Sequence, residues 1–294
     1  MTAIELPSDA RRLLEAARLQ RTPCGAGHIV WRLWGAGAPL VMLHGGAGSW
    51  THWVRNIAAV VAAGRLACVP DLPGFGDSDL PPGGKDADAV VLPLADGIAV
   101  LCGDMPVDIV AFSFGSLVAA LLAAQMPRRV SRLIVVGAPV LPLQTGKGMT
   151  LKPWIHLPTQ DERNDIHRFN LQAIMLHRPT SIEGPALALQ ALNVPRDRMP
   201  GRKLVTTHAF RDALGQIECE FWVVYGAEDS LYKDRWPEVL GMLGANALCR
   251  GTTLIPDAGH WVQFEEADRF NAELMWMLAQ PAEPDGSTVG RTGC

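Results

Sequence analysis

The sequence predicts an α/β fold in which a mostly parallel sheet is flanked by helices. Short apolar runs rich in Val, Ile and Leu alternate with helix-like segments along most of the chain. Several of these runs end in loops that carry Gly, Asp, Ser or His, and functional groups of open parallel sheets lie beyond the carboxyl ends of strands. The 294 residues are enough for one large domain with a buried core. We therefore expect right-handed crossovers that make successive strands parallel.

The elements expected before residue 138 alternate between strand and helix. Strands are expected at five apolar runs: residues 28–34, 39–43, 65–71, 107–111 and 130–136. Helices are expected at residues 8–20, 50–63, 88–102 and 116–124. Pro93 falls inside the third of these helices and weakens that assignment, because proline removes a helical hydrogen bond.

The next stretch differs in character from the rest of the chain. Residues 139–210 hold many Pro, His and Arg residues and no strand-like run, and their helical pieces are clearest at 161–176 and 185–192. We expect them to form a helical lid between two parts of the core. The alternation then resumes with strands at 220–225 and 252–255 and helices at 237–243 and 265–278. The expected division is a core of residues 1–138 and 211–280, a lid of residues 139–210 and a disordered tail of residues 281–294.

Composition and charge exclude several classes of protein. The 26 basic and 30 acidic residues are interspersed, and no basic stripe suggests a nucleic acid partner. No uninterrupted apolar span is long enough for a membrane helix. The first residues lack the layout of a secretory signal, and the six cysteines show no metal-like pairing, so we expect a cytoplasmic protein with free thiols. The expected partner is a small-molecule substrate, with no metal or cofactor; a homodimer is left open.

The pentapeptide Ala111-Phe112-Ser113-Phe114-Gly115 is the centre of the predicted site. It joins an apolar, β-branched run to an Ala/Leu-rich run, which indicates a strand, a sharp turn and a helix with serine at the apex. Small residues two positions before and after the serine are what a strained turn of this kind needs, although alanine replaces the more usual first glycine. A buried serine at the start of a helix is the alternative.

Four other strand ends carry distinctive loops, which are His44-Gly-Gly, Asp71-Leu-Pro-Gly-Phe-Gly-Asp-Ser, Gly-Ala-Glu-Asp229 and Ala-Gly-His260. The order serine, then acid, then histidine is that of the α/β-hydrolases. With these five motifs in order, the chain resembles the α/β-hydrolase superfamily from about residue 27 to residue 280. The resemblance implies an eight-stranded, mostly parallel sheet with flanking helices and a helical lid.

The chemistry of serine hydrolysis assigns a catalytic role to three of these residues. A serine hydroxyl is a weak nucleophile at neutral pH and needs an adjacent base, for which His260 is the candidate. Asp229 would orient the imidazole and stabilise its charged form. Glu228 and Asp257 are rival acids, but Asp229 matches the superfamily's Gly-x-x-Asp position. We expect Glu228 to face solvent and Asp257 to cap its loop.

A developing oxyanion needs two preorganised donors. The N–H of Phe114, the residue after the nucleophile, would supply one of them. The N–H of Gly46 would supply the other, with Ala47 as an alternative. His44 is expected to be a structural hydrogen-bonding residue, and the loop that begins at Asp71 is expected to brace the turn. The substrate-binding residues expected from their proximity to these groups, or from their aromatic character, are Gly45, Phe112, Trp261, Trp50 and Trp154.

A serine at the turn argues against the dehalogenase and epoxide-hydrolase branches, which use aspartate there. We favour a serine esterase acting on small apolar or aromatic esters. The alternative is a C–C bond hydrolase of the meta-cleavage-product type, which residues 44–56 and 259–271 resemble. That family has asparagine where this chain has Phe112, and a lid arginine that holds the substrate carboxylate. The expected lid contains arginines that fit no motif of that family: Arg163, Arg168, Arg178, Arg196 and Arg198. A slow-turnover ligand-binding receptor is a third hypothesis from a different class.

Overall fold

The computed structural model describes residues 4–142 and 151–281 and confirms the predicted fold class. Eight strands form one sheet in the order β1-β2-β4-β3-β5-β6-β7-β8. The first two pairings are antiparallel and the remaining five are parallel. The strands are β1 (Arg18–Cys24), β2 (Gly27–Trp34), β3 (Pro39–Leu43), β4 (Leu66–Pro70), β5 (Val107–Phe112), β6 (Val130–Val136), β7 (Glu220–Gly226) and β8 (Cys249–Ile255).

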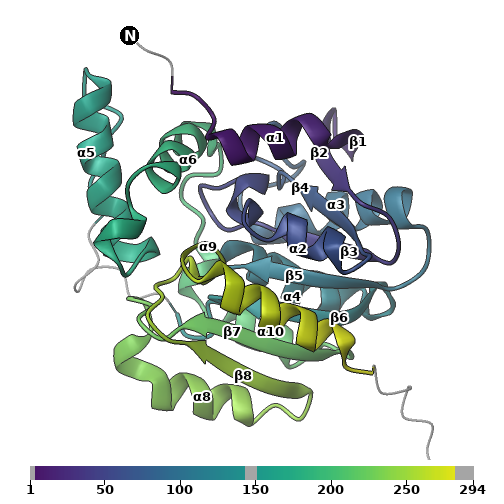
Figure 1. Cartoon of the computed structure of the whole chain (residues 1–294). Helices are drawn as coiled ribbons and strands as arrows, with labels where there is room; N and C mark the ends of the chain where they lie inside the picture. The colour runs from purple at the N-terminus through teal and green to yellow at the C-terminus, as the bar shows by residue number, and fades with distance from the viewer. Residues whose placement is uncertain (1–3, 143–150, 282–294) are drawn as a thin grey trace, which may run out of the picture.

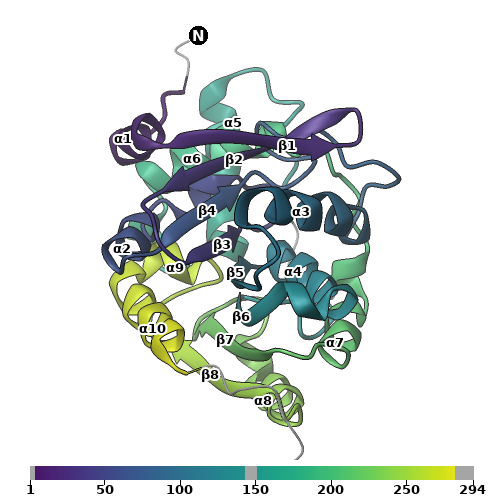
Figure 2. The same cartoon turned by 90° about the vertical axis from the view of Figure 1, so that its right-hand side faces the viewer.

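Helices cover both faces of the sheet, as Figure 2 shows. On one side lie α3 (Ala87–Cys102), α4 (Phe114–Gln125) and α7 (Ala209–Leu214). On the other side lie α2 (Ile57–Ala62) and α10 (Ala267–Ala279), with α1 (Ser8–Ala16) near the β1 edge. The remaining core helices are α8 (Trp236–Gly244) and the short α9 (Val262–Glu265). Each face of the sheet therefore buries its own apolar cluster against helices, which gives the three layers of an α/β core.

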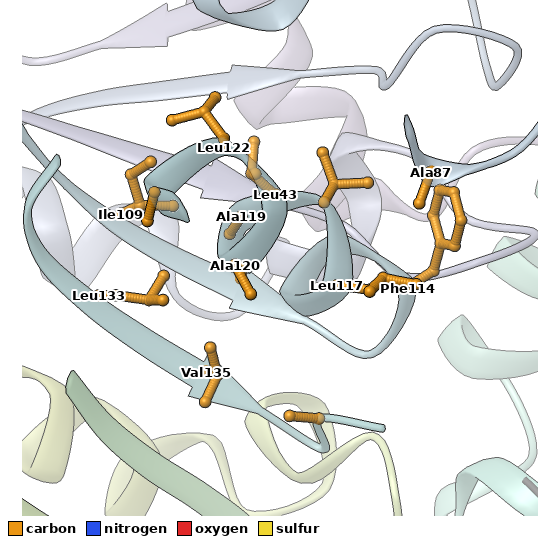
Figure 3. Close-up of a cluster of buried hydrophobic side chains, with 14 of the residues drawn as sticks. Leu43, Ala87, Ile109, Phe114, Leu117, Ala119, Ala120, Leu122, Leu133 and Val135 are labelled. Carbon is orange, nitrogen blue, oxygen red and sulfur yellow. The ribbon is translucent and has the colours of Figure 1, made fainter. Parts of the chain in front are cut away.

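The helix that follows the predicted serine turn is buried on nearly every side. Figure 3 shows Leu117, Ala120 and Leu122 of α4 against Leu43, Ile109 and Leu133 of the central strands. All six side chains are fully buried. The alanines of α4 allow the helix axis to lie close to the sheet, and this packing fixes the start of the helix beside the end of β5.

Strand β1 is the one strand of the described sheet that the sequence did not predict. Its seven residues are mostly exposed, and Pro23 lies among them, so they show no apolar alternation. The expected helix at residues 8–20 instead ends at Ala16, and β1 pairs with β2 through a tight turn at Gly25, whose φ is +59°. The expected helix at 50–63 is likewise divided into a 3₁₀ turn, η1 (Trp50–Trp53), and α2.

The described residues between β6 and β7 form helices and turns and no strand. They include α5 (Gln160–Asn170), the π-helical turn η3 (Leu171–Met175) and α6 (Pro185–Asn193). Figure 1 shows α5 and α6 together on one side of the molecule, away from α10. Helix α7 crosses the predicted boundary at residue 210 and packs against α4, so it lies with the core. The predicted tail lies outside the described residues except for Pro281. No helix of the described ranges is long and apolar enough to span a membrane.

Candidate active site

Ser113 stands between β5 and α4 with a strained backbone, at φ 50° and ψ −114°. A positive φ is costly for a residue with a side chain and persists only where the surroundings enforce it. The Ser113 N–H donates to the Val136 carbonyl at 2.8 Å, which ties the turn to β6. Gly115 is needed on the other side, because a Cβ there would lie 2.5 Å from the His44 carbonyl oxygen. Ser113 occupies the N-cap position of α4, as the alternative interpretation expected, but its side chain makes no cap bond to the helix.

The structure brings Ser113, His260 and Asp229 into one hydrogen-bonded chain. His260 Nε2 lies 2.9 Å from Ser113 Oγ, and His260 Nδ1 lies 2.7 Å from Asp229 Oδ2. Asp229 is fully buried, and its other oxygen accepts from the Leu231 N–H at 3.0 Å. A buried carboxylate on Nδ1 favours the tautomer in which Nε2 accepts the serine proton. These three side chains come from the ends of β5, β7 and β8.

The rival acids lie elsewhere. Asp257 is exposed at a left-handed position of the loop after β8, with φ 58°. Glu228 is half-buried rather than facing open solvent. Of the three candidate acids, Asp229 is the one whose carboxylate contacts His260.

Two histidines hold the loop that follows β3. His44 Nδ1 donates to the Gly45 carbonyl at 2.7 Å, and its Nε2 accepts from the Leu72 N–H at 2.8 Å. His52 Nδ1 accepts from the Gly45 N–H at 3.2 Å. Burial lowers the pKa of both imidazoles, most strongly for His52. The structural role expected of His44 agrees with these bonds, whereas no role for His52 was visible in the sequence.

This loop faces the serine turn. Gly46 and Ala47 both line the space above Ser113, and Ala47 has φ 51°. The N–H of Phe114 belongs to the first turn of α4, where amides have no partner within the helix. The loop that begins at Asp71 contacts the serine turn, as expected, because the ring centroids of Phe75 and Phe114 lie 5.6 Å apart. The residues proposed as oxyanion donors therefore lie on both sides of Ser113.

A cavity of about 490 Å³ opens on Ser113 and His260. Trp154 is the one expected substrate-binding residue among the described residues that line it. The two expected oxyanion donors, Gly46 and Phe114, line it as well. The insertion contributes further to its wall, through Leu151, Lys152, Pro153, Asn170, Ile174, Met175, Gln190, Val194, Arg202 and Val205. The remaining described lining residues are Pro139, at the start of the insertion, and four core residues: Ala47, Gly137, Leu231 and Tyr232.

Four expected substrate-binding residues do not line this cavity, which corrects the prediction for each of them. Phe112 lies behind His260, with ring centroids 5.0 Å apart. Trp261 stacks on Phe264 at 4.2 Å and donates its indole N–H to the His52 carbonyl. Trp50 packs against Trp34, and a Cβ on Gly45 would lie 2.9 Å from the Phe112 ring. For Phe112 and Trp261, which directly adjoin Ser113 and His260 in sequence, the prediction failed because neighbouring residues of a strand or turn point to different sides.

The lid arginines named from the sequence also lie outside the cavity wall. Each of them is bound to a carboxylate or carbonyl of the protein: Arg163, Arg168, Arg178, Arg196 and Arg198. Among the described residues that line the cavity, the cationic side chains are Lys152 and Arg202, neither of which sits in a recognisable motif. Within residues 4–142 and 151–281, no group of three or more His, Cys, Asp or Glu side chains is placed to hold a metal ion.

A model of the Alpha/beta hydrolase family matches residues 40–273, so the chain belongs to this family. Among curated proteins, it is 27% identical to a 2-hydroxy-6-oxo-6-phenylhexa-2,4-dienoate hydrolase of Burkholderia cepacia, over 83% of this chain and 89% of the relative. It is also 27% identical to a pimeloyl-[acyl-carrier protein] methyl ester esterase of Pectobacterium carotovorum, over 84% and 97%. Among solved structures, an esterase from a Rhodococcus species superposes with a TM-score of 0.71 at 22% identity, over 90% of this chain and 99% of the other. The chain is thus a hydrolase whose relatives include C–C bond hydrolases and esterases.

Proposed function

We propose that the protein is a serine hydrolase that cleaves carboxylic esters of small apolar or aromatic compounds. The observation that carries the proposal is the chain from Asp229 through His260 to Ser113, which opens on a cavity walled mainly by apolar side chains. A cavity of about 490 Å³ matches the size of small-molecule sites in general.

The reaction begins with Ser113. His260 removes the hydroxyl proton as Oγ attacks the acyl carbon, and Asp229 stabilises the imidazolium that results. The N–H groups of Phe114 and of Gly46 or Ala47 stabilise the oxyanion of the tetrahedral intermediate. His260 then protonates the leaving alcohol, which departs and leaves Ser113 acylated. Water activated by His260 releases the acid in the second half of the cycle.

The insertion between β6 and β7 acts as a lid. It brings Trp154, Ile174 and Met175 to the cavity, whereas Ser113 and His260 come from the core. The lid therefore sets the shape of the acyl or alcohol site, and the core supplies the chemistry. Apolar side chains at these positions favour aryl and medium-chain groups over sugars or strongly charged groups.

Ser113→Ala tests the proposal. We expect it to lower kcat/KM for p-nitrophenyl and aryl esters by a factor of about 10⁴ or more, because the nucleophile is lost while the fold is retained. The matched control is Ser131→Ala, an exposed serine on β6, which should keep full activity. Retained activity in Ser113→Ala with unchanged circular dichroism would contradict the assignment.

A second candidate function is C–C bond hydrolysis of a meta-cleavage product. The relatives favour it, since four similar curated proteins are named as hydrolases of 2-hydroxy-6-oxo dienoates or of 2-hydroxymuconate semialdehyde. The residue before the serine disfavours it, because Phe112 offers no hydrogen bond where that family has asparagine. A meta-cleavage dienoate assayed beside the esters separates the two functions, and a higher kcat/KM for the dienoate would select the second.

A further inference from the structure

Arg202 is a charged residue of the cavity wall that stands beside the expected oxyanion loop. Its guanidinium occupies the space next to Gly46, where a Cβ would lie 3.0 Å from Nη2. The same guanidinium stands over the rings of Phe75 and Phe114, at 5.0 and 5.1 Å from their centroids. An arginine held between two aromatic faces has little freedom to leave.

The charge of Arg202 is balanced within the protein. Nη1 lies 2.8 and 3.0 Å from the two oxygens of Asp197, and Nη2 lies 3.0 Å from one of them. Nη1 also donates to the Met199 carbonyl at 2.6 Å. Asp197 is itself fixed by the Met199 N–H at 2.9 Å, and its side chain is 14% exposed against 17% for Arg202. Two-point contact and shared burial make this a rigid, net neutral pair.

A neutral pair in this place affects anions and neutral groups differently. A carboxylate that entered the cavity would lose hydration and would meet Asp197 as well as Arg202, so the cation could not compensate fully. A neutral ester carries no such desolvation penalty, and its oxygen can accept from the Nη2 that borders Gly46. The other cation among the described lining residues, Lys152, is exposed, and its Nζ lies 3.7 Å over the Phe169 ring. It therefore remains largely hydrated.

We propose that the Arg202–Asp197 pair determines substrate charge, selecting esters of neutral acyl groups and rejecting half-esters of dicarboxylic acids. The proposal deepens the esterase function above and rests on it. Asp197 is the deciding residue, because it cancels a cation that would otherwise attract a substrate carboxylate. Removing Asp197 should convert the wall beside Gly46 into an anion-binding surface.

The test compares two substrates of similar length, p-nitrophenyl pentanoate and the p-nitrophenyl half-ester of glutaric acid. In the wild type we expect kcat/KM for the half-ester to be lower by a factor of about 10. Asp197→Asn keeps the side-chain shape and frees the charge of Arg202. We expect it to raise the ratio of half-ester to neutral ester by a factor of about 10, mainly through KM. Asp197→Ser, a second variant, should raise it in the same direction.

Three controls isolate the pair. Adding Arg202→Met to Asp197→Asn should abolish the gain, because no cation remains beside Gly46. Asp212→Asn breaks the exposed pair with Arg211 and should leave the ratio unchanged. Lys152→Met should leave the effect of Asp197→Asn intact. An unchanged ratio in both Asp197 variants, or a wild type that prefers the half-ester, would overturn the proposal.

Binding separates this proposal from the esterase function. If the wild type hydrolyses neither ester, the esterase function fails. Calorimetry with glutarate monomethyl ester on Ser113→Ala still measures how the Arg202–Asp197 pair affects the affinity for an anion. We expect the anion to bind about 10 times more tightly when Asp197→Asn is added to Ser113→Ala. Equal affinity in the two proteins would overturn the role of the pair, whatever the reaction.

Discussion

At the scale of single residues, the structure distinguishes between the acids that the sequence offered as partners of His260. Asp229 is fully buried, and its Oδ2 lies 2.7 Å from His260 Nδ1, whereas Asp257 is exposed three residues before His260. Asp229→Asn should lower kcat by a factor of about 10⁴, as loss of the orienting carboxylate does in serine proteases. Asp257→Asn should change kcat by less than about twofold. Steady-state kinetics of both variants provide the check, and a larger loss in Asp257→Asn would show that the acid is misassigned.

The residues of the site divide into those that local sequence could predict and those that it could not. Ser113, Asp229 and His260 stand in motifs that can be recognised from their residue types. Gly115, for example, supplies the small residue that the turn at Ser113 requires. Arg202 stands in no motif, and only folding brings it to Gly46. Phe112 and Trp261 were expected in the wall because they adjoin catalytic groups, but their side chains point into the core behind His260.

At the scale of elements, Glu265 joins the insertion to the loop that carries His260. Its side chain is fully buried at the end of α9, and its carboxylate accepts the N–H groups of His177, Arg178 and Gly259 at 2.7 to 2.9 Å. His177 and Arg178 begin one residue after the π-helical turn that lines the cavity, and Gly259 directly precedes His260. One carboxylate thus fixes the position of the cavity wall relative to His260.

Glu265→Gln places an amide NH₂ against donors and removes the negative charge that they share. We expect the free energy of unfolding to fall by about 2 kcal/mol, and kcat to fall with it. Glu266→Gln is the control, because Glu266 pairs with a part-exposed Arg178 and should cost less than about 1 kcal/mol. Urea unfolding measures both, and equal losses in the two variants would refute the special role of Glu265.

The central elements could be predicted because they are buried, and buried strands and helices show a recognisable pattern of apolar residues in the sequence. The runs that became β5, β6 and β7 were placed within two residues of their observed ends. The edge strand β1 was missed because an exposed strand needs no apolar alternation. The expected helix at 161–176 changes to a π-helical turn at Leu171. No residue type in this segment indicates that the backbone hydrogen bonding changes there.

At the scale of the whole molecule, the buried neutral histidines make stability depend on pH. Burial lowers the pKa of His44 and His52 in the folded protein, whereas both titrate near 6.5 when unfolded. The unfolded state therefore binds more protons below that pH, and stability that is complete above it is lost as the pH falls. The window begins near pH 6.5 and extends down to the depressed pKa values of the folded state.

The variant His52→Gln isolates one of these groups. Between about pH 7.5 and pH 5, the wild type should lose about 2 kcal/mol more unfolding free energy than the variant, since His52 contributes up to about 1.4 kcal/mol per pH unit. Urea unfolding at several pH values measures the difference in slope. Parallel curves for the two proteins would mean that His52 titrates normally in the folded state.

The order of the motifs along the chain predicted the fold and the family, because that order reflects which strand ends meet at one edge of the sheet. It did not predict the substrate, because the cavity wall comes largely from the insertion, where contacts between distant residues decide which side chains face inward. The chain from Asp229 through His260 to Ser113 does not by itself separate ester from C–C hydrolysis, because both proposed functions use it.

The most direct test of the central claim is to trap the acyl-enzyme. A p-nitrophenyl ester is mixed with the wild type and with Asp229→Asn, in which turnover is slow, the reaction is quenched in acid, and digested peptides are analysed by mass spectrometry. We predict an acyl group on the peptide that contains Ser113, accompanied by a burst of p-nitrophenol, and neither in Ser113→Ala. Rapid turnover with no acylated peptide, or an acyl group on another residue, would contradict the serine mechanism.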